Sequence, residues 1–229
     1  PSPGDRLHIQ FQGPLAVAPG ARVVEIDGEE ATAPQIAALQ SDGRLVSCYT
    51  SAGSVEDWRA DASAFPAASV GSELDGWPGE RWLDIRDPAV LAVLRVRLQS
   101  LAEKGCQLVE LDNVDGYDND TGFPVTKADQ IAFDRSLARA AREAGLSPGL
   151  KNATGLIRAL ASDFDWALNE ECVTYRECSA YRPFVKARKA VFVLEYGEVP
   201  LSKVCSVAKR NGLSAQIAHL SLDGVSRHC

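Results

Sequence analysis

The sequence predicts an α/β fold, a single (β/α)8 TIM barrel that comprises residues 1–229 as one domain. Three observations predict it. Short apolar runs alternate with helical patterns along the whole chain. Several of these runs are almost continuously hydrophobic, which is typical of parallel strands buried on both faces. Eight such runs in 229 residues fit a closed barrel better than an open sheet. The turn Gln12-Gly13-Pro14 after the first run also lacks the glycine-rich phosphate motif of a Rossmann-type fold.

Each expected strand is a short run rich in branched apolar residues. The eight runs are Leu7–Phe11, Arg22–Ile26, Leu45–Thr50, Gln107–Leu111, Gly149–Asn152, Asp165–Asn169, Ala190–Glu195 and Ser214–His219.

Two helices between these strands have clear boundaries. Residues 87–104 place leucines at three- and four-residue steps, which gives one apolar stripe, and Gly105 follows as a C-cap. Residues 126–144 open with a Thr-x-x-Asp capping pattern, carry small alanines on the apolar side and end at Gly145. Both patterns predict helices that pack against a parallel sheet.

Composition excludes several classes of function. The net charge is -7 and the basic residues are interleaved with acids, so a nucleic-acid partner is not expected. No run approaches 18 uninterrupted apolar residues, so no membrane association is expected either. The acidity serves solubility or attracts a cationic substrate. We expect a monomer.

The cysteines indicate an oxidising compartment. There are six, an even number, and no metal-ligand spacing such as CxxC gathers them with the three histidines. Disulfides are therefore favoured over zinc. The sequence has no methionine at all, so we also expect that an export signal was removed before Pro1 and that the protein is secreted.

Polar residues follow the apolar runs, where the active site of a (β/α)8 barrel lies. Carboxylates dominate, and the sequence contains no G-x-S-x-G nucleophile motif. Two carboxylates across a cleft suit glycoside hydrolysis, amides and tyrosines suit sugar hydroxyls, and Trp58, Trp77 and Trp82 offer flat faces for sugar rings. We expect no metal and no cofactor, with a loose calcium loop at DNVDGYDND as the alternative.

Long blocks of the sequence resemble glycoside hydrolase family 114, the endo-α-1,4-polygalactosaminidases. They include LDGWPGERWLDIR, VELDNVDGYDNDTGFPVT and NEECVTYREC, and the similarity runs from about Pro3 to about Asp223. The resemblance implies a secreted barrel that cleaves α-1,4-linked galactosamine polymers. It places the catalytic acids on Asp112 and Glu170, with Asp112 as nucleophile and Glu170 as general acid/base. The sequence departs from the family at His8 and Thr50.

We expect further residues to line the cleft as substrate-binding groups: Asp27, Tyr49, Ser51, Asn113, Asp115, Tyr117, Lys151, Asn152, Asn169 and Tyr196. A cation at Lys151 beside Asp112 would keep that carboxylate ionised. The charge of Glu171 would raise the pKa of Glu170, as a general acid requires. The carboxyl groups should lie roughly 5–5.5 Å apart in a retaining enzyme and roughly 6.5–9.5 Å apart in an inverting one.

Two other functions stay open at this point. One is a catalytically silent barrel that only binds polysaccharide. The other is a hydrolase of a different α-galactoside or amino-sugar polymer.

The cysteines divide into three expected pairs. Cys172 and Cys178 would brace the loop after the sixth strand, close to Glu170. Cys205 with Cys229 would tie the C-terminus to the last helix, and Cys48 with Cys106 would link the third strand to the start of the fourth.

Overall fold

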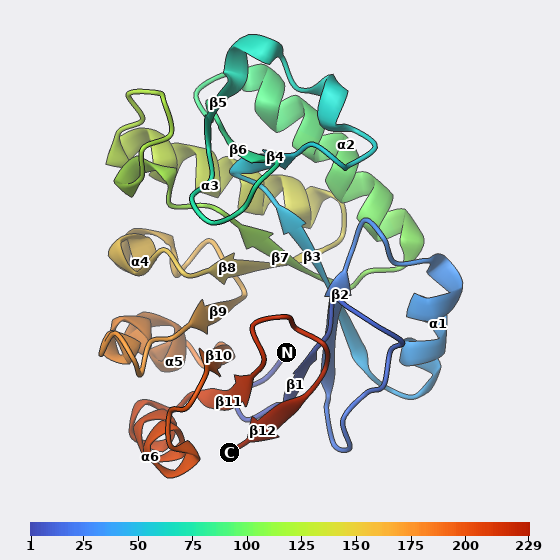
Figure 1. Cartoon of the computed structure of the whole chain (residues 1–229), viewed down its shortest axis with the longest axis vertical. Coiled ribbons are helices and arrows are strands. Elements are labelled where there is room, and N and C mark those ends of the chain that lie inside the picture. The colour runs from blue at the N-terminus through green and yellow to red at the C-terminus, as the bar shows by residue number, and fades with distance from the viewer.

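The computed structural model describes residues 1–229 and contains the expected barrel sheet (Figure 1). Eight parallel strands follow one another around the barrel, each hydrogen-bonded to the next. They are β1 (Leu7–Ile9), β2 (Val23–Asp27), β3 (Leu45–Ser51), β7 (Leu108–Asp112), β8 (Ser147–Lys151), β9 (Trp166–Glu170), β10 (Val191–Tyr196) and β11 (Ser214–Ala218). All eight predicted strands are confirmed, with ends that shift by at most two residues.

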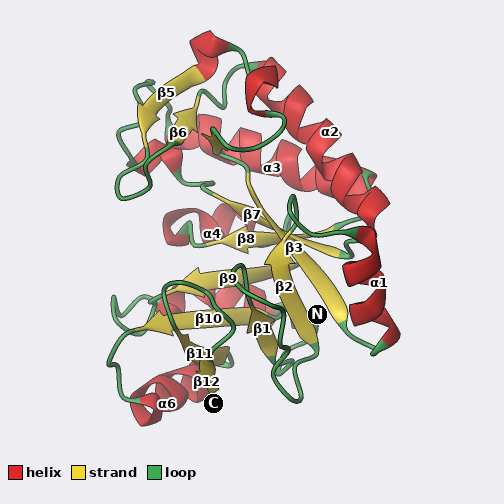
Figure 2. Ribbon diagram, turned by 45° about the vertical axis from the view of Figure 1, so that its right-hand side comes forward, coloured by secondary structure: helices red, strands yellow, loops and turns green.

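The helices surround the sheet, as Figure 2 shows, but they do not follow every strand. They are α1 (Ala33–Ser41), α2 (Pro88–Lys104), α3 (Lys127–Glu143), α4 (Ile157–Leu160), α5 (Arg182–Lys186) and α6 (Leu201–Asn211). Single 3-10 turns lie at Ala62–Ala64, Ala67–Ser69, Gly116–Asp118, Thr154–Leu156 and Cys178–Tyr181. Neither β1 nor β11 is followed by a helix, so the regular strand–helix alternation predicted from end to end is wrong at these two places.

An irregular loop covers β1 where a helix was expected. The Gln10 amide nitrogen donates to the carbonyl oxygens of Gln12 (2.8 Å) and Pro14 (3.0 Å). The backbone nitrogen of Ala18 donates to Nδ1 of His8 at 3.3 Å. Because buried His8 and Gln10 satisfy the backbone of this loop, the chain can cross β1 without regular structure.

A ninth strand completes the sheet next to β11. This strand, β12 (Ser226–His228), is antiparallel to β11, and the residues just before it contact β1. Gln10 forms a bridge with Asp223, and the backbone nitrogen of Phe11 donates to the Leu222 carbonyl oxygen at 2.8 Å. Both chain ends therefore lie at the seam between the first and last parallel strands (Figure 1).

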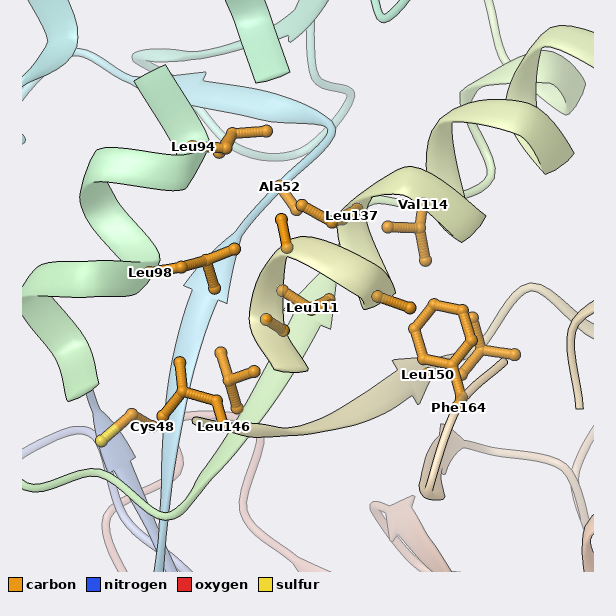
Figure 3. Close-up of a cluster of buried hydrophobic side chains, with 14 of the residues drawn as sticks. Cys48, Ala52, Leu94, Leu98, Leu111, Val114, Leu137, Leu146, Leu150 and Phe164 are labelled. Carbon is orange, nitrogen blue, oxygen red and sulfur yellow. The ribbon is translucent and has the colours of Figure 1, made fainter. Parts of the chain in front are cut away.

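The predicted helix boundaries of α2 and α3 are confirmed by their caps. Asp87 accepts the Ala89 backbone N–H at 2.9 Å, and Gly105 ends α2 in the left-handed conformation with φ 104°. Thr126 and Asp129 form a reciprocal capping box at the start of α3. Both helices pack on β3, β7 and β8 through a continuous apolar core, part of which is drawn in Figure 3, including Leu94 and Leu98 of α2 and Leu137 of α3.

A second, small sheet follows β3 and was not predicted. It has three antiparallel strands in the order β4-β6-β5, with β4 at Ser54–Glu56, β5 at Val70–Glu73 and β6 at Glu80–Leu83. The sheet stands beyond the carboxyl end of β3, beside α2 and α3 (Figures 1 and 2). It therefore extends the barrel mouth on one side.

All three predicted disulfides are present: Cys48–Cys106, Cys172–Cys178 and Cys205–Cys229. No helix combines the length and the apolar character that a membrane span requires.

Candidate active site

One buried ammonium group joins three carboxylates at the barrel mouth. Lys151 ends β8, and its Nζ lies 3.0 Å from Glu110 Oε1, 3.4 Å from Asp112 Oδ2 and 3.3 Å from Glu170 Oε2. The three partners come from β7 and β9, the strands on either side of β8. Because parallel strands present their carboxyl ends at the same edge, acids distant in sequence meet here.

The expected catalytic acids therefore face one another. Since both contact the same nitrogen, their nearest oxygens are less than about 7 Å apart, close enough to act on one glycosidic bond. Their side chains remain accessible, 19% for Asp112 and 29% for Glu170. The pair can reach a substrate atom from the cleft.

Glu170 is held in place by groups at the ends of the two neighbouring strands, β8 and β10. Oε2 accepts the Asn152 amide at 3.2 Å in addition to the Lys151 contact, and Oε1 accepts the Tyr196 hydroxyl. Asn152 also accepts the backbone N–H of Glu170 at 2.8 Å. Both carboxylate oxygens are thus bonded, so the side chain has one defined orientation.

These contacts reverse the expected pKa of Glu170. Burial raises the pKa of Glu170, but the Lys151 charge and the hydrogen bonds from Tyr196 and Asn152 outweigh it, and the pKa is lowered from its ordinary value. The expectation of a raised pKa for Glu170 is therefore wrong. Glu171 adopts a left-handed backbone conformation (φ 62°), and burial is the main cause that raises its own pKa.

Asp112 is oriented by its chain neighbour. Oδ1 accepts the Asn113 backbone N–H at 2.8 Å, and Oδ2 faces Lys151. Asn113 itself has φ 59°, and its amide nitrogen lies 2.9 Å from each of three oxygens, on Ser51, Ser54 and Glu80, which share its two N–H donors. These bonds hold the strained turn that aims the Asp112 carboxylate into the mouth.

The mouth is a cleft of about 850 Å³ that contains most of the predicted residues. Besides the two acids, its walls include Asp27, Tyr49, Asn113, Asp115, Lys151 and Asn152. Four other predicted residues, Ser51, Tyr117, Asn169 and Tyr196, do not line it.

Three of these four residues support the cleft-lining side chains from behind, and the fourth packs against α3 instead. Ser51 is fully buried against Asn113, and Asn169 is buried and donates to Asn152 Oδ1 at 3.4 Å. Tyr196 bonds Glu170 from behind, as described above. The ring of Tyr117 lies under the Lys127 ammonium group, 5.5 Å from it, on the α3 side.

Asp27 lines the cleft but its carboxylate is already occupied. Arg59 donates to Oδ1 at 2.9 Å and to Oδ2 at 2.8 Å, and the backbone N–H groups of Glu29 and Glu30 also donate to Oδ1. Such a bidentate pair leaves little capacity for a sugar hydroxyl. Asp27 therefore fixes Arg59 and the β2 turn.

One wall comes from residues that the search of strand ends missed. The small antiparallel sheet and its loops contribute four acids and three tryptophans: Glu56, Glu73, Asp75, Glu80, Trp58, Trp77 and Trp82. The sequence analysis singled out the tryptophans but not these acids. Trp58 and Trp77 are 54% and 56% exposed, which is unusual for such large apolar side chains and leaves their rings free to stack on a ligand.

The cleft is strongly acidic. Ten carboxylates line it against two cations, Arg59 and Lys151, both of which are already in ion pairs. Burial and the nearby charge of Asp112 raise the pKa of Asp115 to about 6. A cationic ligand would relieve this repulsion. No group of three or more His, Cys, Asp or Glu side chains is arranged to hold a metal ion, including the DNVDGYDND segment.

A parallel barrel with two accessible carboxylates across a cleft at the strand ends defines a glycoside hydrolase. The comparisons identify which kind. The model of the glycoside-hydrolase family GH114 matches residues 1–229, and the chain belongs to this family.

Solved structures give the same picture. Aspergillus fumigatus Ega3, in a crystal structure of its complex with galactosamine, is 36% identical, with a TM-score of 0.94 over 100% of this chain and 96% of that one. The glycoside hydrolase domain of Pseudomonas aeruginosa PelA is 15% identical, with a TM-score of 0.74 over 99% and 98% of the two chains, and shares the fold. An uncharacterised protein of Deinococcus radiodurans is 28% identical over 86% of this chain and 71% of its own length.

Proposed function

We propose that residues 1–229 form one catalytic domain that cleaves internal bonds of an α-1,4-linked galactosamine-containing polysaccharide. The main observation behind this proposal is the carboxylate pair of Asp112 and Glu170, which lies in a cleft lined by further acidic residues. A polymer with free amino groups is cationic, and such a cleft attracts it. The similarity to Ega3, whose structure contains galactosamine, supports the same substrate class.

In this mechanism Asp112 is the nucleophile and configuration is retained. Asp112 attacks the anomeric carbon while Glu170 protonates the leaving oxygen, and water then releases the sugar with Glu170 as base. Asp112 loses its charge in the covalent intermediate. Lys151 stays paired with Glu110 and Glu170, and the pKa of Glu170 falls further because the Asp112 charge is gone, which is what the base step requires. In the free enzyme, the negative charge of Asp112 opposes this effect.

The remaining walls would bind the polymer. Tyr49, Asn113, Asp115 and Asn152 present polar groups to the sugar at the cleavage point, and Trp58 and Trp77 would stack on sugar units further along. Ser51, Asn169 and Tyr196 serve by positioning these groups. Secretion fits the three disulfides, which persist in oxidising compartments.

The test is oligomer release from partially deacetylated galactosamine polymer, followed by mass spectrometry. We expect internal cleavage by the wild type and loss of at least about 1,000-fold in Asp112→Asn and Glu170→Gln, because the pair acts as a unit. Proton NMR of the first-formed anomer reports retention. Polymer binding without turnover by the wild type would indicate a silent barrel instead. Cleavage of only other α-linked glycans would assign a different substrate.

A further inference from the structure

Two glutamates lie buried inside the barrel beneath the catalytic pair. Glu25 of β2 and Glu110 of β7 are both fully buried, on the interior side of their strands. Only β3 separates their strands, Glu25 is in register with Ser47 of β3, and each carboxylate acts on the other's pKa. Glu110 Oε1 contacts Lys151 Nζ at 3.0 Å, so this pair adjoins the ammonium group that joins Asp112 and Glu170.

The hydrogen bonds of this pair are incomplete if both groups are ionised. Neither oxygen of Glu25 has a donor, and Oε2 of Glu110 has none. Two carboxylates only accept hydrogen bonds, so they can satisfy each other only when one carries a proton. Leaving three buried oxygens unpaired would cost several kcal/mol by order of magnitude.

The charges point the same way. Lys151 provides one positive charge to Glu110, Asp112 and Glu170 together, and a fourth negative charge on Glu25 would have no partner. The charged or titratable groups that face Glu25 are Glu110 and Lys151, and Ser47 on β3 is its polar neighbour. An isolated buried carboxylate takes up a proton.

We propose that Glu25 is a neutral carboxylic acid whose hydroxyl donates to Oε2 of Glu110, so that Glu110 stays ionised and anchors Lys151 between the catalytic acids. Glu25 is then a positioning residue that acts through Glu110 and Lys151. The pKa directions agree. Burial and the Glu110 charge raise the pKa of Glu25 well above its usual value, whereas burial raises the pKa of Glu110 but Lys151 and Glu25 oppose the rise. This inference rests on the proposed function of Asp112 and Glu170.

The proton itself can be observed without activity. Carbon-13 NMR of protein labelled at glutamate carboxyl carbons should show a protonated carboxyl signal at pH 7 that disappears in Glu25→Gln. A spectrum in which Glu25 titrates like an exposed glutamate would overturn the proposal. This readout stands even if Asp112→Asn and Glu170→Gln prove active and the proposed catalytic pair fails.

Kinetics test the positioning role with three variants. Glu25→Gln keeps a donor, so we expect kcat within about twofold of wild type. Glu25→Leu removes the donor, and Glu110 then takes up a proton at higher pH. We expect the acid limb of the pH profile to rise by about one unit and kcat at neutral pH to fall about tenfold, with KM little changed. Glu110→Gln, which mimics protonated Glu110, should reproduce that loss.

Asp134→Asn is the matched control, because Asp134 on α3 is equally buried and also has one unpaired oxygen. It should leave the acid limb in place. Equal loss in Glu25→Gln and Glu25→Leu would show that only packing matters, and an unmoved acid limb in Glu25→Leu would refute the role. If Glu25→Leu does not fold, Glu25→Gln, Glu110→Gln and the NMR signal still decide the question.

Discussion

Replacing Lys151 by methionine keeps the length of the side chain and removes the charge that Asp112 and Glu170 share. At 3.3–3.4 Å and an effective dielectric constant of about 20, each contact contributes about 5 kcal/mol of Coulomb energy before the cost of burying the ammonium group. This charge lowers the pKa of Glu170, so we expect its loss to raise the pKa of Glu170.

The assay is the pH dependence of kcat/KM on a soluble galactosamine oligomer. The alkaline limb reports the proton on Glu170, so this limb should move to higher pH. The activity at the optimum should also fall at least about tenfold, because the Glu170 base loses its stabilising charge. Lys189→Met is the matched control, since its ammonium group is also partly buried and donates to the carbonyl oxygens of Ala161 and Phe164. A profile that stays in place, or moves to lower pH, would refute the assignment.

Three further changes test separate parts of the site. Tyr196→Phe removes a donor to the acid/base carboxylate only, so the alkaline limb alone should rise, by about half to one unit, in the same pH assay. The double variant Cys172→Ser/Cys178→Ser opens a short disulfide loop and should lower the free energy of unfolding by about 2 kcal/mol. Urea denaturation measures this loss, and an unchanged unfolding midpoint would contradict it. Gly53→Ala places a methyl group 1.7 Å from the Asn113 carbonyl oxygen, and we expect a loss of at least about 3 kcal/mol in the same measurement; a stable, active variant would contradict the close packing of this turn.

The barrel could be predicted because strands buried on both faces appear in the sequence as nearly continuous apolar runs. Residues 190–195, for example, are almost wholly apolar, and the outward side chains of the strands pack under helices. The strands of the small antiparallel sheet have no such apolar runs. In β6, Glu80 is buried as well as Trp82 and Leu83, because the Glu80 carboxylate accepts hydrogen bonds from Ser54 and Asn113. Its polar and apolar positions therefore do not alternate as an exposed strand requires.

The sequence predicted which residues gather at the site, but it did not predict the ion pairs and hydrogen bonds that these residues form. A strand end is visible in the sequence, so Asp112, Lys151 and Glu170 could be placed at one mouth. Asp27 could equally be placed there, but its ion pair with Arg59, 32 residues away, follows no local pattern. The pKa of Glu170 was predicted from its chain neighbour, whereas contacts across strands decide it.

The seam between β1 and β11 also constrains the order in which the chain can fold. β1 is synthesised before the other barrel strands, yet the residues that bond its far end, Leu222 and Asp223, follow all eight parallel strands in the chain. Until then one edge of β1 has no partner, and an unpaired strand edge invites association with other chains. The Cys205–Cys229 bridge ties the segment after β12 to α6, so it can close only after the residues of this seam have been synthesised.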